Sequence, residues 1–243
     1  MRRTSVTAIF LSMVMLVMSA PAVMGDAITI TRISGYYTGS GGEFNITPVG
    51  GALPGVLSSY ASVATYGGGF ESFCIEKNEY IGIPETVNFT MTNSAVNGGV
   101  SGGNPDPISK GTAFLYSQFA AGTLAGYTYT TAGGNRSVSA GQLQNAIWCL
   151  EGEGSCESNP FLSLVDSTFG NRLAAEQANG GTYAVMALNN TTPGGTRRQD
   201  MLVYGYREDG GGLAAVPEPG SMLLLGSGLL GLGSGLFRKK VRK

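Results

Sequence analysis

Two apolar segments, one at each end of the chain, restrict the globular domain to the residues between them. Met1, Arg2 and Arg3 precede an apolar run over residues 8–18, and small residues follow up to Gly25. This order is typical of a secretory signal peptide. We expect cleavage after Gly25, with Ala22 as the alternative, so that residues 1–25 are removed. An uncleaved membrane anchor is the other interpretation, but the apolar run is short for a membrane span.

The second apolar segment covers residues 221–237 and is followed by a basic tail at 238–243. Just before it stand Val216, Pro217, Glu218 and Pro219. Its length, about seventeen apolar or small residues, is at the lower limit for a transmembrane helix. The basic tail would stay in the cytoplasm. The pattern therefore predicts an exported domain that a C-terminal transmembrane helix tethers to the inner membrane.

The order of Pro-Glu-Pro, a glycine- and leucine-rich helix and a basic cluster resembles the PEP-CTERM sorting signal of Gram-negative envelope proteins. The resemblance covers residues 216–243. It implies an exosortase as partner, a membrane transpeptidase that cuts near the Pro-Glu-Pro, and a producer of extracellular polysaccharide. It also implies anchoring in the inner membrane before sorting and a later place at the cell surface or in the extracellular matrix. An ordinary tail anchor is the alternative.

The composition excludes several classes of function. The chain has 39 glycines, only 13% charged residues and no histidine. Without histidine there is no Ser-His-Asp triad, no Cys-His pair and no histidine metal site. We expect no enzymatic turnover beyond a single covalent reaction, no cofactor and no metal. Between the basic tails, 8 basic residues stand against 16 acidic ones, a net charge of −8 that disfavours nucleic-acid binding.

The domain expected at residues 26–208 is α+β, mainly an antiparallel sheet in a sandwich or barrel, with two to four helices packed on it. Residues 209–215 form a glycine-rich linker. Alternating or β-favouring residues predict strands between 28 and 49, and at 73–75, 85–93, 127–131, 183–188 and 201–206. Helical spacing predicts helices at 109–121, 141–150, 161–169 and 172–178. Residues 57–66 are ambiguous.

The helix expected at residues 141–150 contains the only tryptophan, Trp148. Gln144 lies one helical turn before it, so the two side chains are neighbours on the helix surface. Ser139 is a suitable residue to cap the start of this helix. Its apolar stripe is formed by Leu143, Ala146, Ile147 and Leu150.

Three cysteines in an exported chain leave one without an intramolecular partner. Cys149 and Cys156 bracket a glycine-containing loop that can close a small disulfide ring, which leaves Cys74 over. The alternative disulfide pairing joins Cys74 to Cys149 and leaves Cys156 free.

Two segments of the chain, Phe73-Cys74-Ile75 and residues 143–148, resemble the signature segments of bacterial thioester domains. In that family an apolar or aromatic residue precedes the reactive cysteine, and a Gln-x-x-apolar-Trp helix supplies the acyl partner. The resemblance implies an internal thioester between Cys74 and Gln144. Phe73, Ile147 and Trp148 would form its pocket. Leu143 departs from the pattern, because many members have threonine there.

Such a thioester would bind covalently to an amine or hydroxyl on a polysaccharide, a protein or a neighbouring cell. It needs no histidine, because a thiolate is a good leaving group. Glu76 or Glu79 would accept the proton, and Gln142 is the alternative acyl partner if the helix faces the other way. The competing interpretation is a non-reactive structural protein of the envelope or biofilm matrix, held by disulfides.

Overall fold

The computed structural model describes residues 27–49, 69–96 and 103–205. The expected signal peptide, the ambiguous segment 57–66, the linker and the sorting signal lie outside these ranges. Within them, no helix has both the length and the apolar character needed to cross a membrane.

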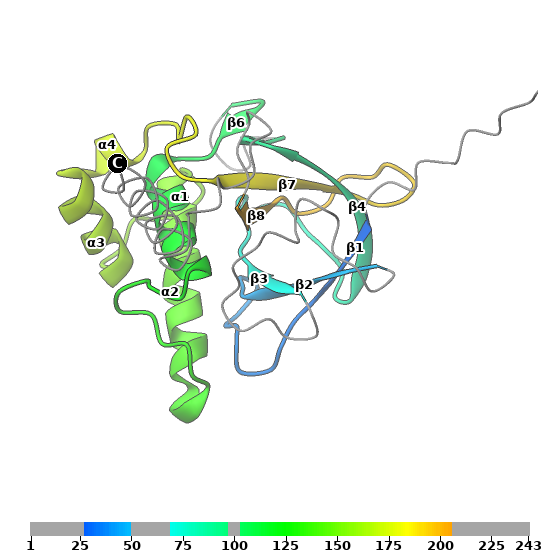
Figure 1. The fold of residues 1–243 in the computed structure, drawn as a ribbon, viewed down its shortest axis with the longest axis horizontal. Coiled ribbons are helices and arrows are strands. Elements are labelled where there is room, and N and C mark those ends of the chain that lie inside the picture. Colours follow the sequence, from blue (N-terminus) through cyan, green and yellow to red (C-terminus); the bar gives the residue numbers. More distant parts are fainter. Residues whose placement is uncertain (1–26, 50–68, 97–102, 206–243) are drawn as a thin grey trace, which may run out of the picture.

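A strongly curved, six-stranded antiparallel sheet forms one half of the fold (Figure 1). Its order is β3-β2-β1-β4-β7-β8. The strands are β1 (Ala27–Thr31), β2 (Phe44–Pro48), β3 (Phe70–Ser72), β4 (Glu85–Thr92), β7 (Val185–Thr191) and β8 (Met201–Tyr204). Alternation sets the faces: Ile28 and Ile30 of β1 are fully buried, whereas their neighbours are half-buried. A separate pair joins β5 (Ser94–Ala95) to β6 (Asp106–Pro107).

The two edges of the large sheet approach each other, so that the sheet is nearly a barrel. Beyond β3, Cys74 forms an isolated antiparallel bridge with Met201 of β8. The Leu202 N–H donates to the Phe73 carbonyl at 3.2 Å, and the Ile75 N–H donates to the Asp200 carbonyl at 3.0 Å. The expected antiparallel, barrel-like sheet is therefore confirmed. The strand expected at 73–75 is reduced to this bridge, because β3 itself ends at Ser72.

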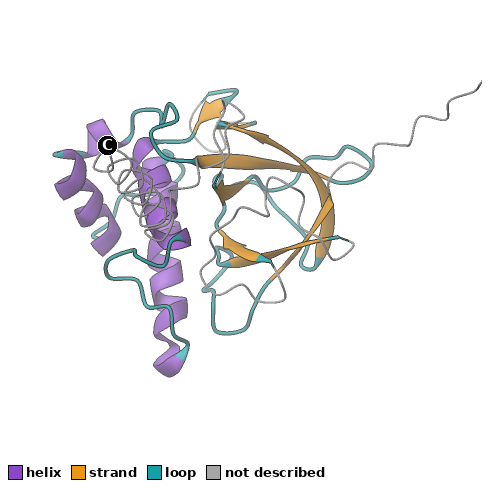
Figure 2. Ribbon diagram, in the orientation of Figure 1, coloured by secondary structure: helices purple, strands orange, loops and turns teal. Residues whose placement is uncertain are grey.

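Four helices pack together on one side of the sheet (Figure 2). They are α1 (Lys110–Ala120), α2 (Asn135–Leu150), α3 (Pro160–Phe169) and α4 (Arg172–Ala175). Side-chain caps open three of them: Ser109 for α1, Asn159 for α3 and Asn171 for α4.

Helix α2 begins earlier than the sequence predicts. Its N-cap is Gly134 in the left-handed region (φ 73°), after a short 3-10 turn (Ala132–Gly134). The expected cap Ser139 lies inside the helix, where its hydroxyl accepts a hydrogen bond from the Thr128 N–H at 3.1 Å. The expected strand at 127–131 was also wrong. Tyr127 instead packs its ring against Phe119 of α1, with centroids 5.0 Å apart.

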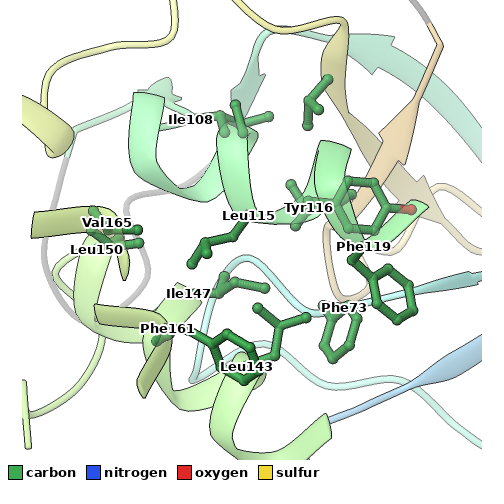
Figure 3. Packing of buried hydrophobic residues seen from close by; sticks show 14 of the residues in the cluster. Phe73, Ile108, Leu115, Tyr116, Phe119, Leu143, Ile147, Leu150, Phe161 and Val165 are labelled. Atoms are coloured by element: carbon green, nitrogen blue, oxygen red, sulfur yellow. The ribbon is translucent and has the colours of Figure 1, made fainter. Parts of the chain in front are cut away.

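Two hydrophobic cores result, and the chain around Cys74 contributes to both. Phe73 and Ile75 point into the core between the helices and the sheet, where Phe73 meets Phe119 edge to face at 5.0 Å (Figure 3). Cys74 belongs to the other core, inside the curved sheet. Consecutive residues of an extended chain point to opposite faces, and this puts the thiol on the barrel side.

Candidate functional site

The side-chain carboxamide of Gln144 is hydrogen-bonded to the main chain of Cys74. Its Oε1 accepts from the Cys74 N–H at 3.0 Å, and its Nε2 donates to the Cys74 carbonyl at 2.9 Å. On the opposite side, Leu202 of β8 and Asp200 just before it pair with the flanking polar groups of Phe73 and Ile75. Gln144 therefore takes the place of a neighbouring strand, and it does so while only 1% exposed.

A glycine loop between β1 and β2 supplies a second donor to the same oxygen. The Gly42 N–H donates to Gln144 Oε1 at 3.2 Å. Gly41 makes this approach possible, because a Cβ there would lie 2.5 Å from Cγ of Gln144 and 3.2 Å from the Trp148 ring. Two main-chain N–H groups thus converge on one buried carbonyl oxygen. The arrangement is that of an oxyanion hole, which stabilises negative charge on such an oxygen.

Arg32 holds the glycine loop in position. Its Nη1 donates to the Gly39 carbonyl at 3.1 Å, and its Nη2 donates to the carbonyls of Ser40 and Gly41. The guanidinium also lies over the Phe44 ring, 4.5 Å from its centroid. The sequence contains no signal that connects Arg32, Gly41 or Gly42 with Cys74, beyond the glycine-rich turn itself.

Cys74 is a buried free thiol, 3% exposed. Burial raises its pKa to about 12, the nearby Arg32 cation opposes this rise, and the Glu79 carboxylate adds to it. The thiol is therefore protonated at neutral pH in the folded protein. A reaction of this sulfur needs its proton to be removed within the site.

A cavity of about 220 Å³ opens beside Cys74, and we call it the inner cavity. Glu79, Tyr80 and Arg32 contribute polar walls, and Phe44 and Trp148 contribute aromatic ones. Of the two suggested proton acceptors, Glu79 lines this cavity. Glu76 is not among the residues that line it. The Glu76 side chain is fully buried, and its carboxylate oxygens have no hydrogen-bond partner within the described part of the chain.

The three residues expected to form a thioester pocket do not all lie beside Cys74. Trp148 lines the inner cavity. Phe73 and Ile147 do not, because both point into the core between the helices and the sheet (Figure 3). Gln142, the alternative acyl partner, lines a different cavity. Gln144 is thus the glutamine that reaches Cys74.

A disulfide joins Cys149 to Cys156, which is the first of the two pairings considered. It closes the loop that follows α2 over Trp148, whose carbonyl accepts from the N–H groups of Glu153 and Gly154. Glu153 in turn accepts from the Lys77 N–H at 3.0 Å. The closed loop therefore supports the segment that follows Cys74.

No set of three or more cysteine, aspartate or glutamate side chains in the described ranges is arranged to hold a metal ion. Buried carboxyls are nevertheless common. Burial first, and then repulsion from Glu153 and other acidic groups, raises the pKa of Glu76 to about 9. Similarly, burial followed by repulsion from Glu43 raises the pKa of Glu71 to about 8.

Comparison with known proteins gives one result, and it concerns the C-terminal tail. Residues 215–240 match the family model described as the PEP-CTERM protein-sorting motif. The chain carries a PEP-CTERM sorting signal. Such a signal belongs to exported proteins that an exosortase processes at the membrane and sorts to the cell surface. No curated protein and no solved structure matches the chain.

Proposed function

We propose that this PEP-CTERM protein forms an internal thioester between Cys74 and Gln144 and uses it for covalent attachment at the cell surface or in the extracellular matrix. The observation that carries the proposal is the carboxamide of Gln144, buried against Cys74 with two N–H donors on its oxygen. A glutamine that served only to fill space would not require this geometry. The C-terminal helix would anchor the chain in the inner membrane until sorting.

The forming step is an acyl transfer. The Cys74 sulfur attacks Cδ of Gln144, and negative charge collects on Oε1, where the N–H groups of Gly42 and Cys74 stabilise it. The Cδ–Nε2 bond then breaks, and the thiol proton leaves with the nitrogen as ammonia. Fixed proximity can lower such a barrier by about 7–11 kcal/mol. Glu79 is the carboxylate in the inner cavity that can relay the proton.

The attaching step uses an amine or hydroxyl of another molecule. Its nitrogen or oxygen forms a bond to Cδ of Gln144, the Cδ–Sγ bond breaks, and the nucleophile's proton ends on the Cys74 sulfur. The products are an amide or ester on Gln144 and a free Cys74 thiol. Burial of the site protects the stored bond from water until such a nucleophile enters.

Intact-mass measurement of the full chain tests the proposal. We expect a deficit of one ammonia, in addition to the two hydrogens lost in the disulfide. Methylamine should remove the deficit and label Gln144. Cys74→Ala should abolish both effects, and Gln142→Ala should change neither. A wild-type mass without the ammonia deficit, from freshly exported protein, contradicts the proposal.

The second candidate is a structural envelope or matrix protein without a reactive bond. One observation favours it: every polar atom of the Gln144 carboxamide is already hydrogen-bonded, so that the side chain can serve purely as a link between α2 and the sheet. For this candidate, methylamine leaves the mass unchanged.

A further inference from the structure

A second cavity, which we call the outer cavity, lies next to the inner cavity. It has a volume of about 320 Å³. Gln142 and Asn145 of α2 form one wall, Ser155, Glu157 and Ser158 form the other, and Trp148 and Lys77 complete it. Trp148 and Lys77 also line the inner cavity, so the two cavities share these side chains.

The side chains of the outer cavity favour an uncharged, hydroxyl-rich ligand. Its walls carry amide and hydroxyl groups, which donate and accept hydrogen bonds without charge. The charged residues among its described lining are Lys77 and Glu157, which have opposite sign, and Leu162 is the aliphatic one. A protein partner usually anchors through large apolar side chains, and this cavity offers them little surface.

Trp148 gives the cavity an aromatic surface. The side chain is half-buried, so part of it remains open to a ligand. A sugar ring combines an apolar C–H face, which can stack on the indole, with hydroxyls around its edge for the amides of Gln142 and Asn145.

We infer that the outer cavity binds a neutral saccharide chain beside the Cys74–Gln144 pair. Binding itself does not require the thioester, whereas its consequence rests on the proposed function. A bound saccharide would extend past Trp148 and Lys77, which both cavities share, and bring a hydroxyl into the inner cavity beside Cys74 and its acyl partner. The hydroxyl oxygen would bond to Cδ of Gln144, the Cδ–Sγ bond would break, and the hydroxyl proton would pass to the Cys74 sulfur.

The single tryptophan makes a direct test possible, because all indole fluorescence of the chain comes from Trp148. The full chain in detergent is titrated with dextran, pullulan and galactomannan as neutral probes, with alginate as an acidic probe, and with a lysine-rich peptide. We expect at least one neutral polysaccharide to change the fluorescence saturably. Cys74→Ala should bind it as tightly as wild type does.

Variants of one helix supply the matched comparison. Asn145→Ala removes an exposed amide from the cavity wall and should weaken binding roughly three- to tenfold, the fold-change expected from losing one hydrogen bond or two. Asn135→Ala, an exposed asparagine at the other end of α2, should leave binding unchanged.

The outcomes separate this inference from the proposed function. No saturable response to any neutral polysaccharide, or a response to the peptide or alginate alone, overturns the saccharide site even if the ammonia deficit is present. Binding that Asn145→Ala and Asn135→Ala weaken equally also overturns it. Binding of a neutral polysaccharide to a chain without the deficit supports the saccharide site and contradicts the thioester.

Discussion

The carboxamide of Gln144 pairs with both main-chain polar groups of Cys74, 70 residues earlier in the chain. Side chains of buried glutamines usually satisfy scattered partners, whereas this one completes the hydrogen bonding of an extended segment. The same contact places the side-chain acyl group of Gln144 beside the free cysteine. Structural support and chemical reactivity would thus depend on one side chain.

Replacing Gln144 should remove both roles at once. Gln144→Met keeps the length of the side chain but leaves the Gly42 N–H, the Cys74 N–H and the Cys74 carbonyl without partners. Unpaired buried groups cost about 1–3 kcal/mol each, and partial relaxation should reduce the total to roughly 2–4 kcal/mol. Urea unfolding measures this loss, and methylamine labelling should disappear. Gln142→Met, with its side chain in the outer cavity, should stay within about 0.5 kcal/mol of wild type. Equal stability of the two variants would contradict the structural role.

Gly41→Ala should disturb the site by overpacking. The added Cβ would lie 2.5 Å from Cγ of Gln144, a distance that forces α2 or the loop to move. We expect a loss of about 1–3 kcal/mol in unfolding free energy and a lower yield of the ammonia-deficient mass. Gly194→Ala is the control, because its Cβ would lie 3.7 Å from the nearest atom. Normal thioester yield in Gly41→Ala would show that the loop does not need to approach Gln144 so closely.

The disulfide should contribute stability mainly by restricting the unfolded chain. Cys149 and Cys156 are seven residues apart, and a loop of that size corresponds to about 2–3 kcal/mol. Cys156→Ser should lower the unfolding free energy by this amount, measured in urea. Ser155→Ala, an exposed neighbour, should have no effect. The ammonia deficit should persist in Cys156→Ser, since Cys74 belongs to no disulfide. Loss of the deficit would show that the closed loop is required to form the bond.

Stability should fall as pH rises above about 5, because buried carboxyls hold their protons in the folded state. The pKa of Glu76 is raised from 4.5 to about 9, chiefly by burial. Between these values the folded chain binds more protons than the unfolded chain. The stabilisation is therefore complete below pH 4.5 and is lost as pH rises towards 9. Urea midpoints at pH 5, 7 and 9 should show the decline. Glu76→Gln should flatten it, and Glu157→Gln, at an exposed position, should not. If the urea midpoints of the two variants fell equally with pH, the decline would belong to carboxyls other than Glu76.

Replacing Arg32 should lower the yield of the thioester. Arg32→Met removes three hydrogen bonds to the glycine loop and also the cation that lowers the pKa of Cys74. Thioester yield after refolding should drop severalfold, and recovery at higher pH should be incomplete because the loop is no longer held. Arg32→Lys keeps the charge, and its thioester yield should lie between those of the wild type and Arg32→Met. The ammonia-deficient fraction by mass spectrometry is the measure. Full thioester yield in Arg32→Met would show that Arg32 is not needed to form the bond.

The sequence alone determined the features that depend on neighbouring residues. Alternating or β-favouring residues predicted β1, β2, β4, β7 and β8, and helical spacing predicted α1, α3, α4 and the last turns of α2. The Pro-Glu-Pro, apolar and basic order predicted the sorting signal that residues 215–240 match. Each of these patterns involves residues close together in the chain, so it can be recognised from the sequence alone. Ser139 and residues 127–131 were misassigned because a glycine turn and packing against α1 outweighed their local preference.

Only the tertiary structure decided how the site is built. Closure of the sheet at Cys74 and Met201 turned the thiol towards the barrel, while Phe73 turned towards the helices. The Gly42 N–H reaches Gln144 across 102 residues, and no local pattern encodes that distance. The reason is physical: a hydrogen bond between remote segments depends on how layers pack, whereas strand and helix periods depend on a few adjacent residues.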